Sequence, residues 1–404
     1  MIYFLIPRTY NEDVYTHLHC HPTDEMPQAI ISESLSYYLY DIKERIHEYE
    51  QDWDQFKKYT NPYEFIHSNL PNRRKSISKY KPLSRSFFKM MEIIHAFNLI
   101  PILQKTITDI KPIVVTPPPG ITQSIRTFHL AEGPGGFIEA VAKLRNCPTD
   151  LYVGMTIQCG SVNEDVPGWK KSSRFLRETP QVYIENGVDN TGDILQLCNF
   201  VGCYEKYGSS MDLITADGGF DFSLDFNHQE VHIARLLYAQ IAYALVMQRR
   251  GGSFVLKIFD AFMAHTVDLL YLLSSMYEKV YISKPLTSRF ANSEKYIVCQ
   301  GFLHDNCEEF FPALRNAFFY MTALTSMQHV YRFLQCTIPL HFKYRLEECN
   351  AVLGQQQVET IHQTIALMNV YKNRDRLDQL MRVNIQKCID WCVCHKLEYN
   401  RELF

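Results

Sequence analysis

Short apolar, β-branched segments alternate with longer amphipathic segments between residues 126 and 303 of this 404-residue chain. The short segments have the length of buried strands, whereas Phe137 to Leu144 and Asn227 to Arg250 have helical length. Seven strands are expected: Thr127 to Ala131, Leu151 to Thr156, Val182 to Glu185, Met211 to Ala216, Ser253 to Ile258, Lys279 to Ser283 and Lys295 to Gly301. This alternation predicts an α/β fold whose mostly parallel sheet is covered by helices on both faces.

The last two expected strands should run antiparallel. Only about 11 residues join Ser283 to Lys295, and a parallel crossover needs roughly a dozen or more, usually including a helix. We therefore expect an antiparallel pair at one edge of the sheet.

The flanking segments are less regular. The N-terminal run MIYFLIPRTY reads as a first strand, because its apolar stretch ends at Pro7 and lacks the basic start of a signal peptide. The segment from 117 to 120, Pro-Pro-Pro-Gly, predicts a hinge or tight turn ahead of the alternating region. After residue 304 no strand pair is evident, and helices such as Phe310 to Leu334 and Val358 to Val370 are expected.

Composition narrows the class of protein. A formal net charge of −3 excludes an overall basic coat, so any polyanion must meet a local patch. Twelve scattered cysteines indicate reduced thiols and a cytoplasmic protein. The longest apolar stretch, Ala234 to Met247, is shorter than the roughly 20 residues of a membrane span, so no membrane association is expected.

A glycine-rich turn is the sharpest local feature. The sequence from Leu130 to Phe137, Leu-Ala-Glu-Gly-Pro-Gly-Gly-Phe, follows a strand and precedes a helix. Ligands bind at this edge of a doubly wound sheet, where glycines let the backbone approach a nucleotide. The third glycine of a dinucleotide fingerprint would fall at Ile138, which disfavours NAD.

Three ionisable residues lie at other strand ends. Asp217 and Lys257 end two expected parallel strands, and Glu294 begins the antiparallel one. Each alone reads as an ordinary turn or surface residue. Their strands bring all three to one edge beside the glycine turn, where a lysine between two carboxylates can tune proton transfer.

Together these motifs resemble the FtsJ-like (RrmJ-like) family of S-adenosylmethionine-dependent ribose 2′-O-methyltransferases, whose signature is a Lys-Asp-Lys-Glu tetrad around a glycine-rich cofactor loop. The leading lysine is Lys89, in Ser84-Arg85-Ser86-Phe87-Phe88-Lys89-Met90-Met91-Glu92-Ile93, which is similar to the family's helix upstream of that loop. The resemblance implies a Rossmann-like methyltransferase sheet and a catalytic tetrad of Lys89, Asp217, Lys257 and Glu294.

The resemblance is closer to mRNA cap-type members, including those encoded by large DNA viruses. It rests on Gly154-Met155-Thr156 and on the segment from Val188 to Ile194. The cofactor contacts it implies are Glu132, Gly133, Pro134, Gly135, Gly136, Phe137, Thr156, Asp193 and Asp217. Two features depart from the family: Glu132 replaces a small residue, and Thr156 stands where a ribose-binding acid is expected. The division that follows is an extension over 1–83, a methyltransferase domain over 84–303 and an α-helical region over 304–404.

The implied function is methylation of an RNA ribose 2′-hydroxyl, at the cap-proximal nucleotide of mRNA. Lys257 would deprotonate or electrostatically activate the hydroxyl, Asp217 and Glu294 would orient it, and Lys89 would support the oxyanion. The alternatives are a catalytically silent RNA-binding or complex-forming subunit, and a methyltransferase for ribosomal or transfer RNA.

The sequence also gives expectations for RNA contacts, a protein partner and metal binding. Capped RNA is expected to contact basic residues and one tyrosine, which are Arg73 to Lys81 with Tyr80, Lys170, Lys171, Arg174 and Arg289. A protein partner could dock on residues 304–404. No metal is expected, because neither Cys388, Cys392, Cys394 and His395 nor His17, His19, Cys20 and His21 has the spacing of paired zinc ligands.

Overall fold

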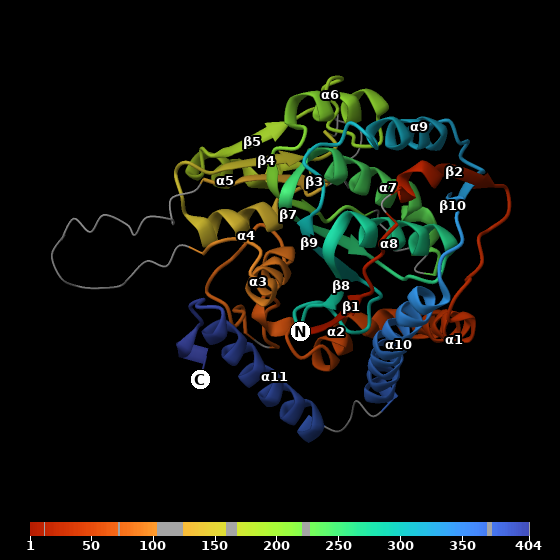
Figure 1. Cartoon of the computed structure of the whole chain (residues 1–404). Coiled ribbons are helices and arrows are strands. Elements are labelled where there is room, and N and C mark those ends of the chain that lie inside the picture. The colour runs from red at the N-terminus through yellow and green to blue at the C-terminus, as the bar shows by residue number, and fades with distance from the viewer. Residues whose placement is uncertain are drawn as a thin grey trace.

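The computed structural model describes residues 1–11, 13–71, 73–102, 124–158, 168–219, 227–369 and 374–403. The expected proline turn at 117–120 lies outside these residues. The described elements form a central sheet with helices on both faces, and the two long C-terminal helices lie along one side (Figure 1).

The central sheet has eight strands in the order β1-β8-β9-β7-β6-β3-β4-β5. Strands β7, β6, β3, β4 and β5 pair in parallel, whereas β9 runs antiparallel to both β7 and β8. The bounds are β1 Ile2–Ile6, β3 Arg126–Leu130, β4 Leu151–Met155, β5 Val182–Glu185, β6 Met211–Ala216, β7 Gln248–Ile258, β8 Tyr277–Lys284 and β9 Lys295–Phe302. The predicted Rossmann-like sheet and its antiparallel β8–β9 pair are confirmed.

One strand was placed differently from expectation. Seven strands were predicted for the sheet, and β1 is the eighth, pairing antiparallel with β8 from Ile2 opposite Lys284 to Ile6 opposite Val280. The N-terminal strand was expected, but its partner was not. One of the two edge strands of the sheet therefore belongs to the N-terminal extension.

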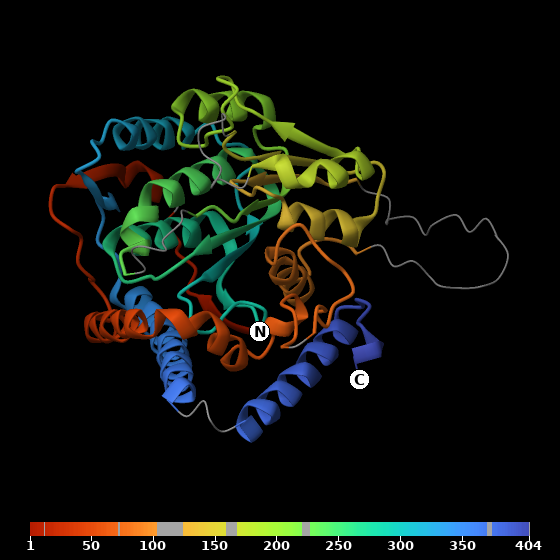
Figure 2. The ribbon, with the colours of Figure 1, turned by 180° about the vertical axis from the view of Figure 1, so that it is seen from behind.

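Alternate residues of the strands enter different cores, because successive side chains of a strand point to opposite faces. Phe254 and Leu256 pack with α6 Leu197–Tyr207, α7 Gln229–Met247 and α8 Ala264–Met276. Val255 points the other way and packs with α3 Ser86–Phe97 and α4 Gly136–Arg145. Figure 2, seen from behind, shows the same separation of the two helical layers.

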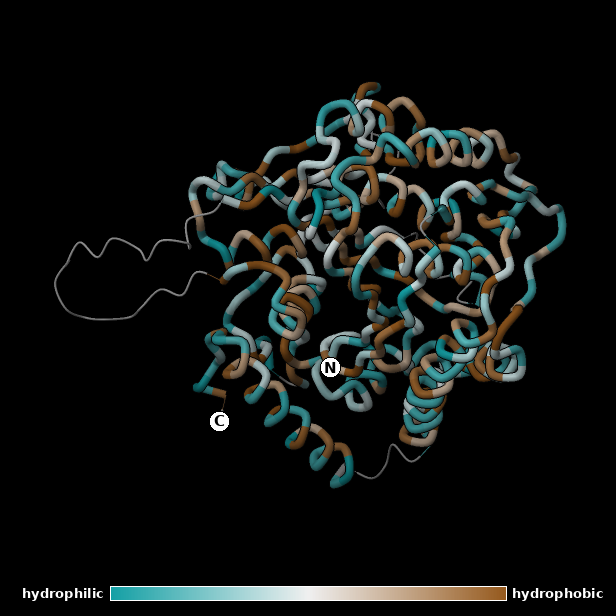
Figure 3. Tube along the Cα trace, in the orientation of Figure 1, coloured by the Kyte–Doolittle hydropathy of each residue, from teal (hydrophilic) through white to brown (hydrophobic). Residues whose placement is uncertain are grey.

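Helix α3 is buried on nearly all sides. Its residues from Ser86 to Ile94 are all buried, and Figure 3 shows it as mainly hydrophobic. A polar side chain on α3 is therefore held in an almost dry environment.

Further helices are α1 Glu33–Glu44, α2 Glu50–Thr60 and α5 Ser173–Glu178. The 3₁₀ turns are η1 Val14–His17, η2 Arg45–Tyr49, η3 Glu64–Ile66, η4 Trp169–Ser172 and η5 Arg401–Leu403.

The C-terminal region is not purely helical, contrary to expectation. The helix expected over Phe310 to Leu334 ends early, as α9 Phe311–Thr322, and the chain continues as β10 His329–Leu334. Strand β10 pairs antiparallel with β2 Leu18–Thr23 in a separate two-stranded sheet. The remaining elements are α10 Leu340–Asn369 and α11 Arg374–Cys394.

The three predicted segments share their hydrophobic cores. One core joins Val14 of the extension, Leu245 of α7 and Phe318 of α9, and another joins Phe65, Phe88 and Trp391. The division at 83/84 and 303/304 stays a prediction about sequence organisation. Among the described residues, no helix is both long and apolar enough to cross a membrane, and eleven cysteines are free.

Candidate active site

The sheet itself brings Asp217 and Lys257 together. Strands β6 and β7 are parallel neighbours with Ala216 opposite Leu256, so Asp217, just after β6, and Lys257, near the end of β7, lie at the same edge of the sheet. Lys257 Nζ donates to the Asp217 backbone oxygen at 2.7 Å and lies 3.2 Å from Asp217 Oδ1. This pair was predicted from the strand pattern.

The other two tetrad members come from outside the parallel strands. Glu294 immediately precedes β9, and Lys89 lies in the middle of α3. Lys89 Nζ is 2.7 Å from Glu294 Oε1 and donates to Oε2 at 2.9 Å. The side chains are only 8% and 16% exposed.

Tyr296 joins the two lysine–carboxylate pairs. Its ring is fully buried, and its hydroxyl lies 3.2 Å from Asp217 Oδ1 and 3.3 Å from Glu294 Oε1. One hydroxyl proton is therefore shared between two carboxylates. Tyr296 was not among the predicted site residues, although it comes two residues after Glu294, the spacing that puts two side chains on the same face of a strand.

Burial and charge set the protonation of this centre. Burial lowers the pKa of Lys89, and the Glu294 and Asp217 carboxylates oppose that shift. Burial raises the pKa of Glu294, but Lys89 and Lys257 outweigh it, so the pKa lies below its usual value. Burial and Asp217 raise the pKa of Tyr296 well above its usual value. At neutral pH Glu294 is therefore ionised and Tyr296 is a hydrogen-bond donor.

The loop between β8 and β9 holds Glu294 in place. Its Leu286 and Thr287 N–H groups donate to Glu92 at 2.7 and 2.8 Å. Glu92 lies three residues after Lys89 on α3, so one helix fixes both the lysine and the loop. At the far end, Lys284 Nζ donates to the Glu294 backbone oxygen at 2.6 Å.

On the cofactor side, Glu132 and Phe137 point into the protein. Glu132 Oε1 accepts from the Ile138 N–H at 2.7 Å, and Oε2 accepts from Thr215 Oγ1 at 3.0 Å. Phe137 is fully buried and lies 5.8 Å from the Tyr296 ring centroid. The structure therefore gives these two residues a supporting position, in which Glu132 fixes the first turn of α4.

The glycine turn lies beside the turn that carries Asp217. Gly135 has a φ of +103°, a conformation that favours glycine. A Cβ at Gly218 would lie 3.0 Å from the Ala131 Cβ, which places the turns after β3 and β6 against each other. The backbone from Gly133 to Gly136 therefore leads from the end of β3 to the start of α4 at this edge.

Thr156 and Asp193 are also neighbours. A Cβ at Gly192 would lie 2.1 Å from the Thr156 backbone oxygen, so the loop before Asp193 packs on the end of β4. Asp193 accepts from the Leu195 N–H at 2.9 Å and the Gln196 side chain at 2.8 Å. Because β4 and β6 both flank β3, the expected cofactor residues gather along one sheet edge. Backbone groups at strand ends, a helix N-terminus and a carboxylate fit a nucleoside with a charged amino-acid tail.

Most of the expected RNA contacts have protein partners. Lys75 lies 2.6 Å from Glu402, and Lys79 lies 3.5 Å from Glu398. Other side chains are also occupied: Arg73 by the Leu403 oxygen, Tyr80 by Glu139, Arg174 by Glu178 and Arg289 by Glu64. The Lys75 and Lys79 pairs are half-exposed, so they contribute little stability and a phosphate can compete for them.

The two cysteine- and histidine-containing clusters do not form metal sites in the described residues, where no group of three or more His, Cys, Asp or Glu is placed to hold a metal ion. Cys388 and Cys392 are fully buried. Burial raises the pKa of the Cys392 thiol to about 12.

Comparison with known proteins gives a consistent result. A family model described as FtsJ-like methyltransferase matches residues 82–302. Cap-specific mRNA (nucleoside-2′-O-)-methyltransferase 2 of Pongo abelii is 30% identical over 344 residues, covering 83% of this chain and 41% of that protein. The Danio rerio protein of the same name is 30% identical over 381 residues, covering 89% and 46%.

A third relative has a related name. Cap-specific mRNA (nucleoside-2′-O-)-methyltransferase 1 of Leishmania braziliensis is 38% identical over 188 residues, covering 44% of this chain and 45% of that protein. The chain spans less than half of the length of each of these three relatives. The family model covers more than half of the chain, including all four tetrad positions, and the chain therefore belongs to the FtsJ-like methyltransferase family.

Proposed function

We propose that this chain is an S-adenosylmethionine-dependent RNA ribose 2′-O-methyltransferase that acts on the cap-proximal nucleotide of mRNA. The observation that carries the proposal is the meeting of Lys89, Asp217, Lys257 and Glu294 in one hydrogen-bonded cluster. Family membership supports the methyl donor. The names of several relatives support a capped mRNA substrate.

The main task of the protein in this reaction is to position the ribose hydroxyl relative to the methyl donor. S-adenosylmethionine, when bound, supplies a methyl group already activated by its sulfonium. The protein must hold the ribose hydroxyl in line with that methyl and assist loss of its proton. The residues for this lie at the edge where the expected cofactor residues gather, with Asp217 belonging to both sets.

Lys257 is the group we assign to the hydroxyl, as a base or as a positive charge that favours the alkoxide. Asp217 fixes its amine by two contacts. Lys89, held by Glu294, stabilises negative charge that develops on the oxygen. Tyr296 donates to the carboxylates and so fixes the position of one lysine–carboxylate pair relative to the other.

The alternatives are weaker on the same observations. A silent RNA-binding or complex-forming subunit would not need four ionisable groups, each with a hydrogen-bonded partner in a buried centre. A ribosomal or transfer RNA substrate is compatible with the chemistry, but the names of the relatives favour capped mRNA. A protein partner on residues 304–404, a cytoplasmic location and a viral origin stay predictions.

The substrate is tested with labelled S-adenosylmethionine and matched RNAs. Capped RNA, the same RNA without a cap, ribosomal RNA and transfer RNA are incubated separately with the protein. We expect label on capped RNA, in the nucleotide next to the cap after nuclease mapping. Preferential labelling of ribosomal or transfer RNA would overturn the cap assignment, and no transfer to any RNA would favour the silent subunit.

A further inference from the structure

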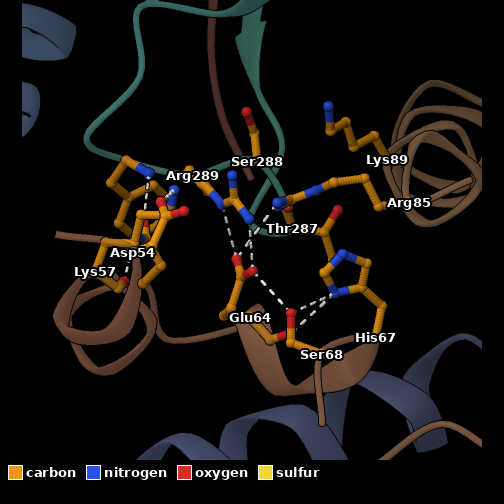
Figure 4. A network of polar contacts seen from close by, with 12 residues as sticks. Asp54, Lys57, Glu64, His67, Ser68, Arg85, Lys89, Thr287, Ser288 and Arg289 are labelled. Carbon is orange, nitrogen blue, oxygen red and sulfur yellow. Dashed lines mark hydrogen bonds and ion pairs between the residues drawn. The ribbon is translucent and has the colours of Figure 1, made fainter. Parts of the chain in front are cut away.

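A second charged cluster lies beside the catalytic centre and uses a residue of the N-terminal extension. The side chain of Glu64, in η3, has 0% exposure. Arg289 approaches it with Nε at 3.1 Å and Nη2 at 2.8 Å. Arg85 Nη1 lies 3.4 Å from the same carboxylate. Two arginines therefore share one buried acid (Figure 4).

This cluster has one more positive than negative charge. Burial raises the pKa of Glu64, but Arg85 and Arg289 outweigh it and hold the pKa well below its usual value. Each arginine side chain remains 25% exposed. The carboxylate thus fixes two guanidinium groups without neutralising both, which leaves donors for an anion.

Both arginines are attached to the segments that carry the catalytic groups. Arg85 precedes α3 and lies one turn before Lys89, and it also donates to the Thr287 backbone oxygen at 3.0 Å. Arg289 lies in the loop that leads to Glu294. In Figure 4 Lys89 and Arg85 extend from the same helix toward this loop.

Arg289 also borders a cavity of about 420 Å³. Its lining includes Trp53, Phe259, Asn292 and Ser293. Phe259 lies two residues after Lys257, and Ser293 immediately precedes Glu294. The lining also contains the acids Glu50 and Asp54 and the lysines Lys43 and Lys57, and Lys57 pairs with Asp54. Arg289 therefore borders a space whose wall includes residues adjacent in sequence to Lys257 and Glu294.

We propose that Glu64 is a positioning residue that holds Arg289 and Arg85 so that their exposed edges receive a phosphodiester of the substrate RNA. A planar guanidinium matches a phosphate with two parallel hydrogen bonds, which requires a fixed orientation. The inference rests on the proposed function for its substrate class. It adds a residue that contacts neither methyl donor nor hydroxyl and acts through two arginines.

The test is Glu64→Gln, which keeps the size of the side chain and removes its charge. We expect KM for capped RNA to rise about 10-fold, with kcat changed less than about threefold and KM for S-adenosylmethionine unchanged. The affinity for a fluorescent RNA, measured by anisotropy without methyl donor, should fall by the same factor.

Asp268→Asn is the matched control. Asp268, on α8, is a buried acid with 1% exposure that lies 3.1 Å from Arg332, and it accepts from Arg332, Phe333 and Leu334 of β10 rather than from a tetrad element. It should lower stability without raising KM for RNA. If Glu64→Gln behaves like this control in every assay, the positioning role is wrong.

A double mutant separates positioning from a general loss of structure. In an Arg289→Ala background, Glu64→Gln should raise KM for RNA by clearly less than the roughly 10-fold expected in wild type, because only the Glu64 contact with Arg85 is then left to lose. Full multiplication of the two effects would contradict the proposal. If Glu64→Gln does not fold, Arg289→Lys is tested in its place. A lysine keeps the positive charge but lacks the planar guanidinium that binds a phosphate through two hydrogen bonds. An unchanged RNA affinity of Arg289→Lys would also contradict the proposal.

Failure of the proposed function is distinguishable from failure of this inference. Wild-type protein that binds RNA but transfers no methyl group would overturn the enzyme assignment alone. The anisotropy measurement still decides whether Glu64 governs RNA affinity.

Discussion

The two halves of the proposed catalytic centre are held by different parts of the molecule. Asp217 follows β6 and Lys257 lies near the end of the adjacent parallel strand β7, and the register of β6 and β7 is enough to place them. Lys89 and Glu294 lie on a helix and a loop, which need further support. The positions of Asp217 and Lys257 therefore follow from two adjacent strands, whereas the positions of Lys89 and Glu294 depend on elements from both ends of the chain.

The second half has three identifiable supports. Asn61 Oδ1 accepts from the Phe290 N–H at 2.7 Å, which ties the loop to the extension. Trp391 Nε1, on α11, donates to Glu92 Oε1 at 2.9 Å. Glu92 in turn holds the loop through two N–H groups. Substitutions in the extension or in α11 should thus displace Lys89 and Glu294 and leave Asp217 and Lys257 in place.

The largest effect is expected for Lys257→Ala, in the sheet-borne half. Methyl transfer should fall about 10²- to 10⁴-fold, the range for loss of acid–base or electrostatic assistance. The measurement is the single-turnover rate with capped RNA. Lys279→Ala, on the exposed side of β8, is the control and should retain the full rate.

Tyr296→Phe breaks the link between the halves. The shared hydroxyl proton is lost, so each carboxylate keeps its lysine but the donor that lies between Asp217 and Glu294 is gone, and kcat should fall about 10-fold. Tyr277→Phe removes a buried hydroxyl that contacts Gln248 at 3.2 Å instead. Equal kcat values for these two variants would show that the halves are not coupled through Tyr296.

Trp391→Phe weakens only the second half. Loss of one hydrogen bond to a buried carboxylate should cost about 1–2 kcal/mol and lower kcat a few-fold through looser packing of α3 and its loop. Thermal unfolding and kcat are measured together. Val393→Ala changes an exposed residue of the same helix, 61% accessible, and a loss of kcat there would argue against a specific route through Glu92.

The smallest effect concerns pH and the docking of α11. Burial and the neighbouring His95 lower the pKa of His395 from 6.5 to about 4, and the two Nδ1 atoms lie 2.9 Å apart. A lowered pKa in the folded state means that the contribution is present above pH 6.5 and lost as pH falls through about 4. Between these values the free energy of unfolding of wild type should fall by at least about 1 kcal/mol more than that of His395→Gln.

Unfolding curves at a series of pH values provide the check. Parallel pH dependence of the two proteins would mean that His395 does not link the docking of α11 to protonation.

The same contrast explains what the sequence could predict. The strand pattern placed Asp217 and Lys257 because their position follows from local hydrophobic runs and parallel pairing. Lys89 was found only through a motif resemblance, since nothing local marks one lysine on a buried helix. Glu64 and Trp391 were missed because their partners, Arg289 and Glu92, lie hundreds of residues away.

The missed strand pair has a similar cause. β2 contains two histidines and a proline, so it lacks the β-branched pattern of a strand, and its partner β10 lies more than 300 residues later. Segments such as these become strands through tertiary pairing rather than intrinsic preference.

The central claim is that four dispersed side chains form one centre for methylating a ribose hydroxyl. The most direct measurement is mass spectrometry of nucleosides released from capped RNA after reaction with wild type and with Lys257→Ala. The account predicts a 2′-O-methylated nucleoside next to the cap with wild type and almost none with the variant. A base-methylated nucleoside, or equal ribose methylation by both proteins, would contradict it.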